Sequence, residues 1–406
     1  MQPQSVQVAQ ASATLWINER VQELRRQGKR IYHFGFGQSP FPIPASVVEA
    51  LREHAHRKEY LPVKGLPALR EAAAAFLSRS RHARFSAEQI LVGPGSKELL
   101  YLMQCHLEGV TYLPSPSWVS YEPQARYCGH PVRWIESENW KLTPENIRAQ
   151  VREPGYLILN YPSNPTGGSF SAEELEALAE VFREKKLVVI ADEIYGRLHF
   201  TGEVPSLASF YPEGTIVTTG LSKWCGAGGW RLGIAAFPDA LRELMEQVAV
   251  MASETYTSAT TPVQLAAVEA YQDTDEILEY LRRARRVLER VADYVHAQCV
   301  AYDLPCIKPM GGFYLFPDFA NYRDRLGVAN SRELCEVLLQ EANLAFLPGS
   351  VFGRPPEELS LRLAFVDFDG EAALAQADEV HEPDWLRRWA PNVVEGMERL
   401  GQYLQG

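Results

Sequence analysis

The chain has 406 residues, a length that favours two domains over a single core. Its composition, with 46% hydrophobic and 22% charged residues, is that of an ordinary globular protein. The formal net charge of −11 argues against nucleic acid and anionic membranes as main partners, although a local basic pocket for a small anion remains compatible with it.

The cysteines and the N-terminus bear on where the protein resides. The six cysteines form no CxxC pair, and in a chain of this length they indicate free thiols in a reducing compartment. The first residues, MQPQSVQVAQASATLW, lack the basic head and long apolar run of a signal peptide. No apolar stretch is long enough to cross a bilayer. We therefore expect a soluble, cytoplasmic protein, with no membrane partner and no bound metal.

In chain order, a Gly- and Pro-rich stretch at residues 34–44 ends an N-terminal arm. Residues 91–107, LVGPGSKELLYLMQCHL, predict a strand end, a tight turn and a helix. Ser171 and Glu174 form a capping box that predicts the start of another helix. Apolar strands are predicted at residues 156–159, 187–191, 215–219 and 232–237. Such strands alternating with helices indicate an α/β protein whose parallel or mixed sheet is covered on both faces.

The pattern changes from about residue 273 to one long amphipathic helix, followed by short strands and helices. This change predicts a second, smaller α+β domain. We expect a large domain over residues 46–285, and a small domain formed by residues 286–406 together with the N-terminal arm, residues 1–45. The stretch VHEPDWLRRWAPN near the C-terminus is expected to be an inserted surface segment.

Three polar residues, Asn164, Asp192 and Lys223, follow predicted strand ends. Each alone is commonly a turn residue, a helix cap or a solvated side chain, but ligands of open α/β sheets bind at the carboxyl ends of the strands. Together the three match the needs of pyridoxal 5′-phosphate (PLP). Lys223 supplies the amine that binds the cofactor aldehyde. Asp192 supplies an anion for the pyridine nitrogen, and Asn164 with Tyr195 supplies donors to the ring oxygen.

The Gly-Pro-Gly turn before the helix of residues 91–107 predicts a site for the cofactor phosphate, because a helix N-terminus presents free N–H groups and a positive dipole end. Ser96 adds a hydroxyl donor, and Arg231 follows Lys223 closely enough for both to reach one cofactor. Trp118 suits stacking on the pyridine ring. Taken singly, such a turn is usually only a turn, such an arginine a surface ion pair, and such a tryptophan a core residue.

Six motifs in this order and spacing resemble the class I/II aminotransferases of PLP fold type I, over about residues 30 to 370. The motifs are YLPVKGLPALREA (60–72), NYPSNPTG (160–167), DEIY (192–195), SK (222–223), GWRLG (229–233) and LRLAF (361–365). The resemblance implies a large domain with a mixed, mostly parallel sheet between helices, and a smaller α+β domain. It also implies an aminotransferase that moves an amino group between an α-amino acid and a 2-oxo acid by a ping-pong PLP mechanism. A homodimer with active sites at the subunit interface is implied as well.

The resemblance further implies a role for each matching residue. Lys223 binds PLP and shuttles the proton, Asp192 pairs with the pyridine nitrogen, and Tyr195 contacts the ring oxygen; these three are the expected catalytic residues. The other implied cofactor contacts are Gly95, Ser96, Lys97, Trp118, Asn164, Ser222, Arg231 and, from the neighbouring subunit, Tyr60. The implied substrate contacts are Gly37, Asn164, Lys97 and Arg362. In Arg362 a planar guanidinium suits a bidentate pair with the α-carboxylate.

Within the family, GPGSKELLYL followed by SPSWVSYEPQARYCG is similar to the bacterial Ib-type aspartate and prephenate aminotransferases. In these a lysine at the place of Lys97 can meet a distal acidic group, which makes dicarboxylic amino acids candidate substrates. The alternative is that Lys97 is merely a solvated residue of the first helical turn. Two features depart from the family: Gly220 stands where several relatives have a phosphate-binding serine, and residues 36–40 replace the usual Gly-Glu-Pro-Asp type of loop.

Other reactions on the same fold remain open, namely those of a C–S β-lyase, a decarboxylase or a cyclising synthase. A non-catalytic PLP-binding regulator is disfavoured, because the short N-terminus leaves no room for a DNA-binding domain. The pocket for the substrate side chain is expected to be lined by residues 253–261 and 34–39.

Overall fold

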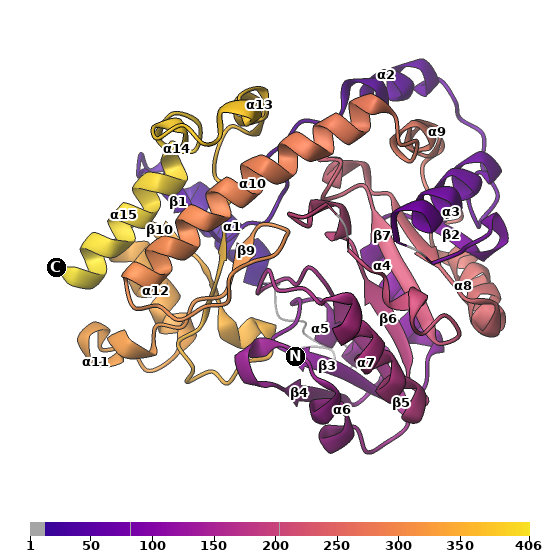
Figure 1. Ribbon diagram of the computed structural model, residues 1–406, viewed down its shortest axis with the longest axis horizontal. Coiled ribbons are helices and arrows are strands. Elements are labelled where there is room, and N and C mark those ends of the chain that lie inside the picture. Colours follow the sequence, from indigo (N-terminus) through magenta and orange to yellow (C-terminus); the bar gives the residue numbers. More distant parts are fainter. Residues whose placement is uncertain (1–12, 82, 203) are drawn as a thin grey trace, which may run out of the picture.

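The computed structural model describes residues 13–81, 83–202 and 204–406, so the first residues, on which the expectation of no signal peptide rests, lie largely outside them. Its main feature is a seven-stranded sheet with the order β2-β8-β7-β6-β5-β3-β4 (Figure 1). β8 runs antiparallel to both neighbours and all other pairs are parallel, which confirms the mixed, mostly parallel sheet. The strands are β2 (Ile90–Gly93), β8 (Gly233–Ala236), β7 (Thr215–Gly220), β6 (Val188–Asp192), β5 (Gly155–Asn160), β3 (Val110–Ser115) and β4 (Val132–Glu136).

Both faces of this sheet are buried under helices, as the apolar strands predict. Successive side chains point to opposite faces, so Leu157 and Val189 join one core cluster while Ile158 and Ile190 join another. The first cluster is closed by α6 (Pro144–Gln150) and α7 (Ala172–Glu184), and the second by α4 (Ser96–His106), α5 (Tyr121–Tyr127) and α8 (Arg242–Thr255). The helices α2 (Ala45–His54), α3 (Pro67–Arg81) and α9 (Thr261–Ala270) pack together beyond the β2 edge.

The helix cap predicted from the sequence is present in the structure. Ser171 caps α7, and its hydroxyl accepts from the Glu174 N–H at 3.2 Å, as the capping box predicts. The long helix expected from about residue 273 is α10 (Asp275–Ala301), which Thr274 caps. Figure 1 shows α10 running from beside α9 to beside α12 (Ser331–Glu341), so that it joins the large sheet to the C-terminal part of the chain.

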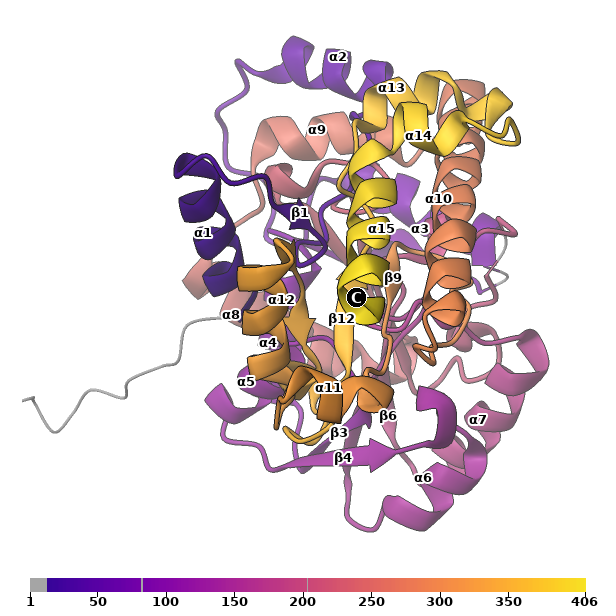
Figure 2. The same cartoon turned by 90° about the vertical axis from the view of Figure 1, so that its left-hand side faces the viewer.

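The C-terminal part is built on two small sheets, which fits the expected α+β arrangement. β1 (Tyr32–His33) pairs in parallel with β10 (Leu344–Ala345), so the N-terminal arm joins this part of the molecule. A second sheet has the antiparallel order β11 (Leu347–Pro348), β12 (Leu361–Ala364), β9 (Tyr314–Leu315). The helices here are α1 (Ala13–Arg26), α11 (Arg323–Leu326), α12, α13 (Gly370–Ala375), α14 (Trp385–Trp389) and α15 (Pro391–Gln405) (Figure 2).

The expectation that residues 380–392 form a surface segment is wrong for their apolar side chains. Trp385 is 2% exposed, and its indole N–H donates to the Gln376 carbonyl at 2.8 Å. Val380, Leu386 and Ala390 are buried with it, while the charged residues between them face solvent. The segment therefore forms the amphipathic helix α14, whose apolar side closes the core beside α10 and α15.

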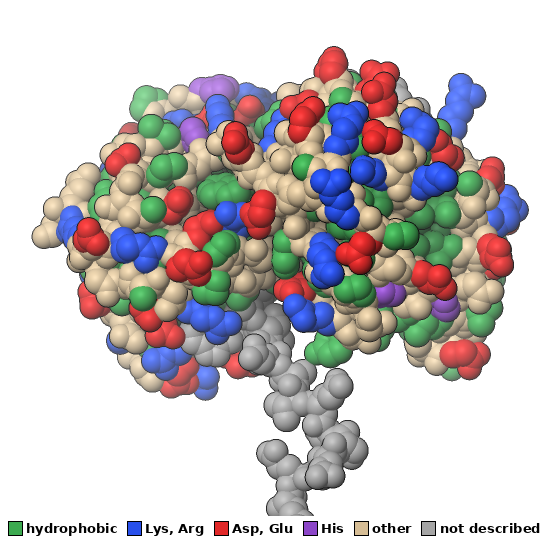
Figure 3. All heavy atoms as spheres, turned by 90° about the horizontal axis from the view of Figure 1, so that it is seen from below, with side chains coloured by type: hydrophobic (Ala, Val, Ile, Leu, Met, Phe, Trp, Pro, Cys, Tyr) green, Lys and Arg blue, Asp and Glu red, His purple; other side chains and the backbone are tan. Residues whose placement is uncertain are grey.

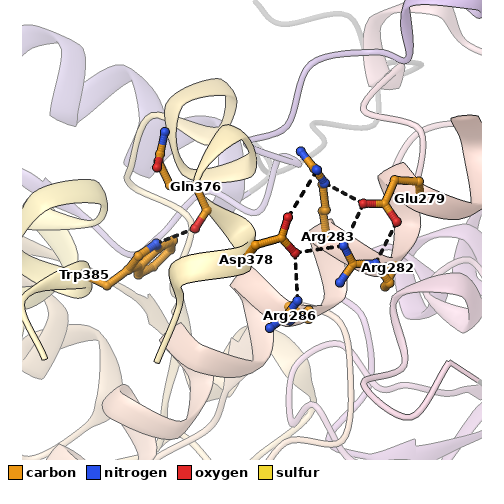
Figure 4. Close-up of polar contacts among 7 residues, drawn as sticks. All are labelled: Glu279, Arg282, Arg283, Arg286, Gln376, Asp378 and Trp385. Atoms are coloured by element: carbon orange, nitrogen blue, oxygen red, sulfur yellow. Dashed lines mark hydrogen bonds and ion pairs between the residues drawn. The ribbon is translucent and has the colours of Figure 1, made fainter. Parts of the chain in front are cut away.

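A cluster of ion pairs holds the preceding turn to α10. The Asp378 carboxylate bonds Arg282, Arg283 and Arg286, and Glu279 bonds the first two of these (Figure 4). On the face of the molecule shown in Figure 3, acidic and basic side chains are intermixed without a broad area of one sign. Among the described residues no helix is both long and apolar enough to span a bilayer.

Candidate active site

A cavity of about 630 Å³ lies at the carboxyl ends of β5, β6 and β7. The register of these strands sets Asn160 beside Asp192 and Asp192 beside Thr218, so their polar ends meet at one edge. Most of the residues predicted for the site line this cavity: Gly37, Ser96, Lys97, Trp118, Asn164, Asp192, Tyr195, Ser222, Lys223, Arg231 and Arg362. The large sheet and the C-terminal part both contribute walls.

Asp192 ends β6 with a fully buried carboxylate. Tyr121 donates to one of its oxygens at 2.6 Å and Thr218 to the other at 3.1 Å. Burial raises the pKa of Asp192 to about 6, against the lowering effect of these two hydroxyls. No described residue forms an ion pair with it. A buried carboxylate with donors but no cation suits a cationic ring nitrogen, which is the group that PLP would place there.

Lys223 lies in the loop after β7, with a partly buried side chain. Its Nζ donates to the Gly37 carbonyl at 2.8 Å and lies 5.5 Å from the centre of the Tyr195 ring. The next residue, Trp224, is fully buried and stacks on Phe76 at 6.4 Å between ring centres. The loop is thus anchored in the core while the lysine amine points into the cavity.

An anion site is formed where β2 turns into α4. Gly95 has φ 94° there, and a Cβ atom at this position would lie 2.2 Å from Nη2 of Arg231. A Cβ at Gly233 would lie 2.2 Å from the Ser96 nitrogen. The two glycines therefore let the Arg231 guanidinium approach the free N–H groups that begin α4. Among the described residues, Arg231 donates only to the carbonyls of Gly228 and Pro94 and pairs with no carboxylate. This anion cradle, formed by Arg231 and the start of α4, therefore suits a phosphate.

The glycine that departs from the family pattern has a local explanation. A Cβ at Gly220 would lie 2.6 Å from the Leu232 carbonyl oxygen, because β7 and β8 pack closely where Gly220 faces Gly233. A serine at this place would require the backbone to shift. Ser96 and Ser222, the two serines among the expected cofactor contacts, both line the cavity.

Arg362 lies on β12 and is only 2% exposed. Nη2 donates to the Gly35 carbonyl at 2.6 Å and Nη1 donates to the Asn164 side-chain oxygen at 3.3 Å. Nε has no hydrogen-bond partner in the described part of the chain, and burial lowers the pKa of this guanidinium. No described carboxylate pairs with it. A buried, unpaired guanidinium at a cavity wall suits a carboxylate ligand.

Lys97 and Trp118 stand on the α4 side of the cavity. The Lys97 Nζ lies 4.9 Å from the centre of the Trp118 ring, a cation–π distance. Burial, followed by the nearby charges of Arg231 and Lys223, lowers the pKa of Lys97. The three cations make this part of the cavity favourable for anionic groups.

Some predicted residues lie elsewhere. Tyr60 is 87% exposed and is not part of the cavity of its own chain. Residues 253–261 do not line the cavity, so that expectation is wrong for the single chain, and of residues 34–39 only Phe36, Gly37 and Gln38 do. Gly95 borders the cavity through its contact with Arg231.

Sequence reasoning missed three hydroxyl residues at the site, Tyr121, Thr218 and Tyr314. Thr218 carried a signal, since it stands near the end of a predicted strand beside Asp192. Tyr121 begins α5 three positions after Trp118, but its contact with Asp192 depends on how α5 packs on the sheet. Tyr314, whose hydroxyl lies 3.0 Å from that of Tyr195, belongs to β9, which is far from Tyr195 in the sequence.

Comparisons with known proteins agree with this geometry. Residues 29–371 match the family model of aminotransferase class I and II. An aspartate aminotransferase of Bacillus sp. (strain YM-2) is 34% identical over 85% of this chain and 90% of the relative. A probable aspartate/prephenate aminotransferase of Aquifex aeolicus is 33% identical over 85% and 89%. The solved aspartate aminotransferase from Thermus thermophilus with maleate superposes with a TM-score of 0.84 and 29% identity, covering 97% of both chains.

The fold and the cavity define a PLP-dependent enzyme of fold type I. The chain belongs to the class I and II aminotransferase family. It is a PLP-dependent aminotransferase, which transfers an amino group between an amino acid and a 2-oxo acid.

Proposed function

We propose that the cavity at the ends of β5, β6 and β7 is where this aminotransferase holds PLP, with Lys223 as its covalent attachment. The observation that carries the proposal is the buried, cation-free Asp192 carboxylate, in one cavity with the Lys223 amine and the anion cradle of Arg231 and α4.

The residues proposed to bind PLP fall into groups, according to the part of the cofactor that each would contact. Asp192 holds the ring nitrogen, Tyr195 and Asn164 the ring oxygen, and Trp118 the ring face. The phosphate is held by Gly95, Ser96, the Lys97 backbone, Ser222 and Arg231. When bound, PLP supplies an electrophilic carbon for the substrate amine and an electron sink for the bond that breaks.

The chain's own residues supply binding, orientation and proton transfer. Arg362 binds the substrate α-carboxylate, and its buried position fixes the direction of the guanidinium fork. Lys223 Nζ, released by the substrate amine, would remove the proton from the substrate Cα as a base and deliver it as an acid to the cofactor carbon that had carried the aldehyde. Gly37 contributes a carbonyl that can hold the lysine amine near the cavity wall.

Dicarboxylic amino acids are the proposed substrate class, with Lys97 as the contact for the distal carboxylate. Relatives carry the name aspartate aminotransferase, and the Thermus thermophilus structure holds maleate, a dicarboxylate. The position of Lys97 supports the proposal, because this exposed residue lines the cavity and holds its Nζ over the Trp118 ring.

A homodimer with shared active sites is also proposed. Tyr60 would reach the phosphate of the partner's site, which agrees with its 87% exposure in the single chain. Sedimentation velocity tests the dimer, and a monomer at micromolar concentration would contradict it.

The proposed domain division, with residues 46–285 in the large domain and residues 1–45 and 286–406 in the small one, places α10 across the boundary.

The experiment for the proposed function is a half-reaction panel. The PLP form is mixed with acidic, aromatic, aliphatic and basic amino acids, and cofactor absorbance follows its conversion from the aldehyde to the amine form. Aspartate and glutamate are expected to react fastest, and a 2-oxo acid should restore the starting spectrum. No response to any amino acid would contradict the proposed site, and a fast response to apolar amino acids alone would contradict the substrate class.

A further inference from the structure

Tyr314 belongs to a short chain of hydrogen bonds at the cavity wall. Its hydroxyl lies 3.0 Å from the Tyr195 hydroxyl and 3.4 Å from the Gly37 carbonyl oxygen. The same carbonyl accepts a closer bond, at 2.8 Å, from Lys223 Nζ. Tyr314 is 2% exposed and lies on β9 opposite Ala364 of β12, so its side chain is enclosed by the protein.

The direction of the bond between the two tyrosines follows from counting protons. A phenol donates one hydrogen bond, although its oxygen can accept others. If Tyr195 donates into the cavity, the proton between the two hydroxyl oxygens must come from Tyr314. Among the described residues, the one other acceptor that Tyr314 reaches is the Gly37 carbonyl, which is farther away and already bound by Lys223.

We propose that Tyr314 is a positioning residue that donates to the Tyr195 hydroxyl and so directs the Tyr195 proton toward the ring oxygen of PLP. The inference rests on the proposed role of Tyr195. A bond accepted by a hydroxyl oxygen polarises its O–H group and strengthens the bond that the group donates. Tyr314 therefore acts on the cofactor only through Tyr195.

The charged groups around the pair are compatible with this direction. Arg362 lies 4.8 Å from the centre of the Tyr314 ring, Lys223 lies 5.5 Å from that of Tyr195, and Asp192 stands in the same cavity. Burial and the contact with Tyr314 raise the pKa of Tyr195 well above its ordinary value, and Arg362 partly opposes this. Tyr195 thus keeps its proton and remains a donor.

Glycine is required at position 37 for the same arrangement. A Cβ atom there would lie 2.0 Å from the Tyr314 hydroxyl oxygen. The Tyr314 hydroxyl therefore occupies the space that a side chain at position 37 would need. The rings of Tyr195 and Tyr314 meet edge to face, with centres 5.6 Å apart, which Tyr314→Phe would preserve.

The test is a pH titration of the cofactor absorbance in the holoenzyme, which reports the pKa of the group formed by Lys223 and PLP. Tyr195→Phe is expected to raise this pKa, because the ring oxygen loses a donor. Tyr314→Phe is expected to raise this pKa by about 0.5 pH unit, because it weakens the hydrogen bond that Tyr195 donates without removing it. Such a shift corresponds to a fraction of the free energy of one hydrogen bond. In the Tyr195→Phe background, adding Tyr314→Phe should change nothing further.

Tyr211→Phe is the matched control, because it removes a buried hydroxyl that donates to the Leu187 carbonyl at 2.9 Å outside the cavity. Its absorbance pKa should equal that of the wild type. A wild-type pKa in Tyr314→Phe, or an undiminished shift in the double variant, overturns the role of Tyr314. A wild-type pKa in Tyr195→Phe instead overturns the proposed role of Tyr195 itself. Thermal unfolding of the cofactor-free variants separates these effects from a loss of fold.

Discussion

The Tyr121 hydroxyl donates a 2.6 Å hydrogen bond to the Asp192 carboxylate, across 71 positions of the sequence. Thr218 donates to the other carboxylate oxygen from the adjacent strand. Two neutral donors hold the carboxylate in one orientation but do not neutralise its charge. The protein therefore keeps a buried negative charge at the end of β6, which a cationic ring nitrogen can neutralise.

This charge gives the cofactor-free enzyme a defined pH dependence. Burial raises the pKa of Asp192 to about 6, so the folded protein binds this proton more tightly than the unfolded chain does. The cost of the buried charge is fully present above about pH 6 and disappears as the pH falls toward the ordinary value for aspartate. Asp192→Asn should therefore gain stability relative to wild type as the pH rises from about 4 to 7, by at most about 3 kcal/mol. Urea unfolding of both proteins across this range measures the difference, and a pH-independent difference would contradict the account.

Lys97→Ala tests the contact with the distal carboxylate. The kcat/KM for aspartate and glutamate should fall about 10- to 100-fold, the value of one charge-assisted hydrogen bond, while aromatic amino acids should be little affected. Lys141→Ala is the matched control, because Lys141 also lies over an aromatic ring, Phe170, but outside the main cavity. Equal losses for acidic and aromatic substrates would show that Lys97 does not select for the acidic group.

Arg362→Lys tests the carboxylate clamp. Lysine keeps the charge but cannot form a bidentate pair, so KM for every amino acid should rise about 10-fold or more, whatever its side chain. Arg285→Lys serves as the control, since Arg285 is also a partly buried guanidinium, held by the Gly202 carbonyl away from the cavity. Steady-state kinetics would contradict the assignment if KM stayed at its wild-type value.

Trp385→Ala tests the role found for the segment first expected on the surface. Removing a fully packed indole should lower the free energy of unfolding by about 3–5 kcal/mol. Trp385→Phe, which keeps most of the ring and loses the bond to the Gln376 carbonyl, should cost only about 1 kcal/mol. Urea denaturation measures both, and a neutral Trp385→Ala would mean that α14 does not close the core.

The site residues that could be predicted from the sequence are those whose position depends on a single strand or turn. Lys223, Asp192 and Asn164 were found because each follows a strand, and the carboxyl ends of neighbouring parallel strands meet at one edge. The anion site proposed for the phosphate could be predicted because a Gly-rich turn directly precedes α4. Capping of α7 by Ser171 could also be predicted, because it involves only Ser171 and Glu174, three positions later.

Contacts between elements that lie far apart in the chain could not be predicted from the sequence. Tyr314 reaches Tyr195 across 119 positions, only because β9 pairs with β12. The burial of Trp385 was hidden for another reason: α14 is five residues long, too short for a clear helical period among its charged neighbours. The exclusion of residues 253–261 from the cavity likewise depends on the path of the loop after α8.

The most direct test of the account is a single-turnover measurement on wild type and Lys223→Ala. Each protein, loaded with PLP, is mixed with aspartate or glutamate, and absorbance follows the conversion of the cofactor from its aldehyde to its amine form. The account predicts rapid conversion in the wild type and a rate lower by about 10²–10⁴-fold in the variant, because the residue that moves the Cα proton is gone. Conversion of Lys223→Ala at the wild-type rate would contradict it.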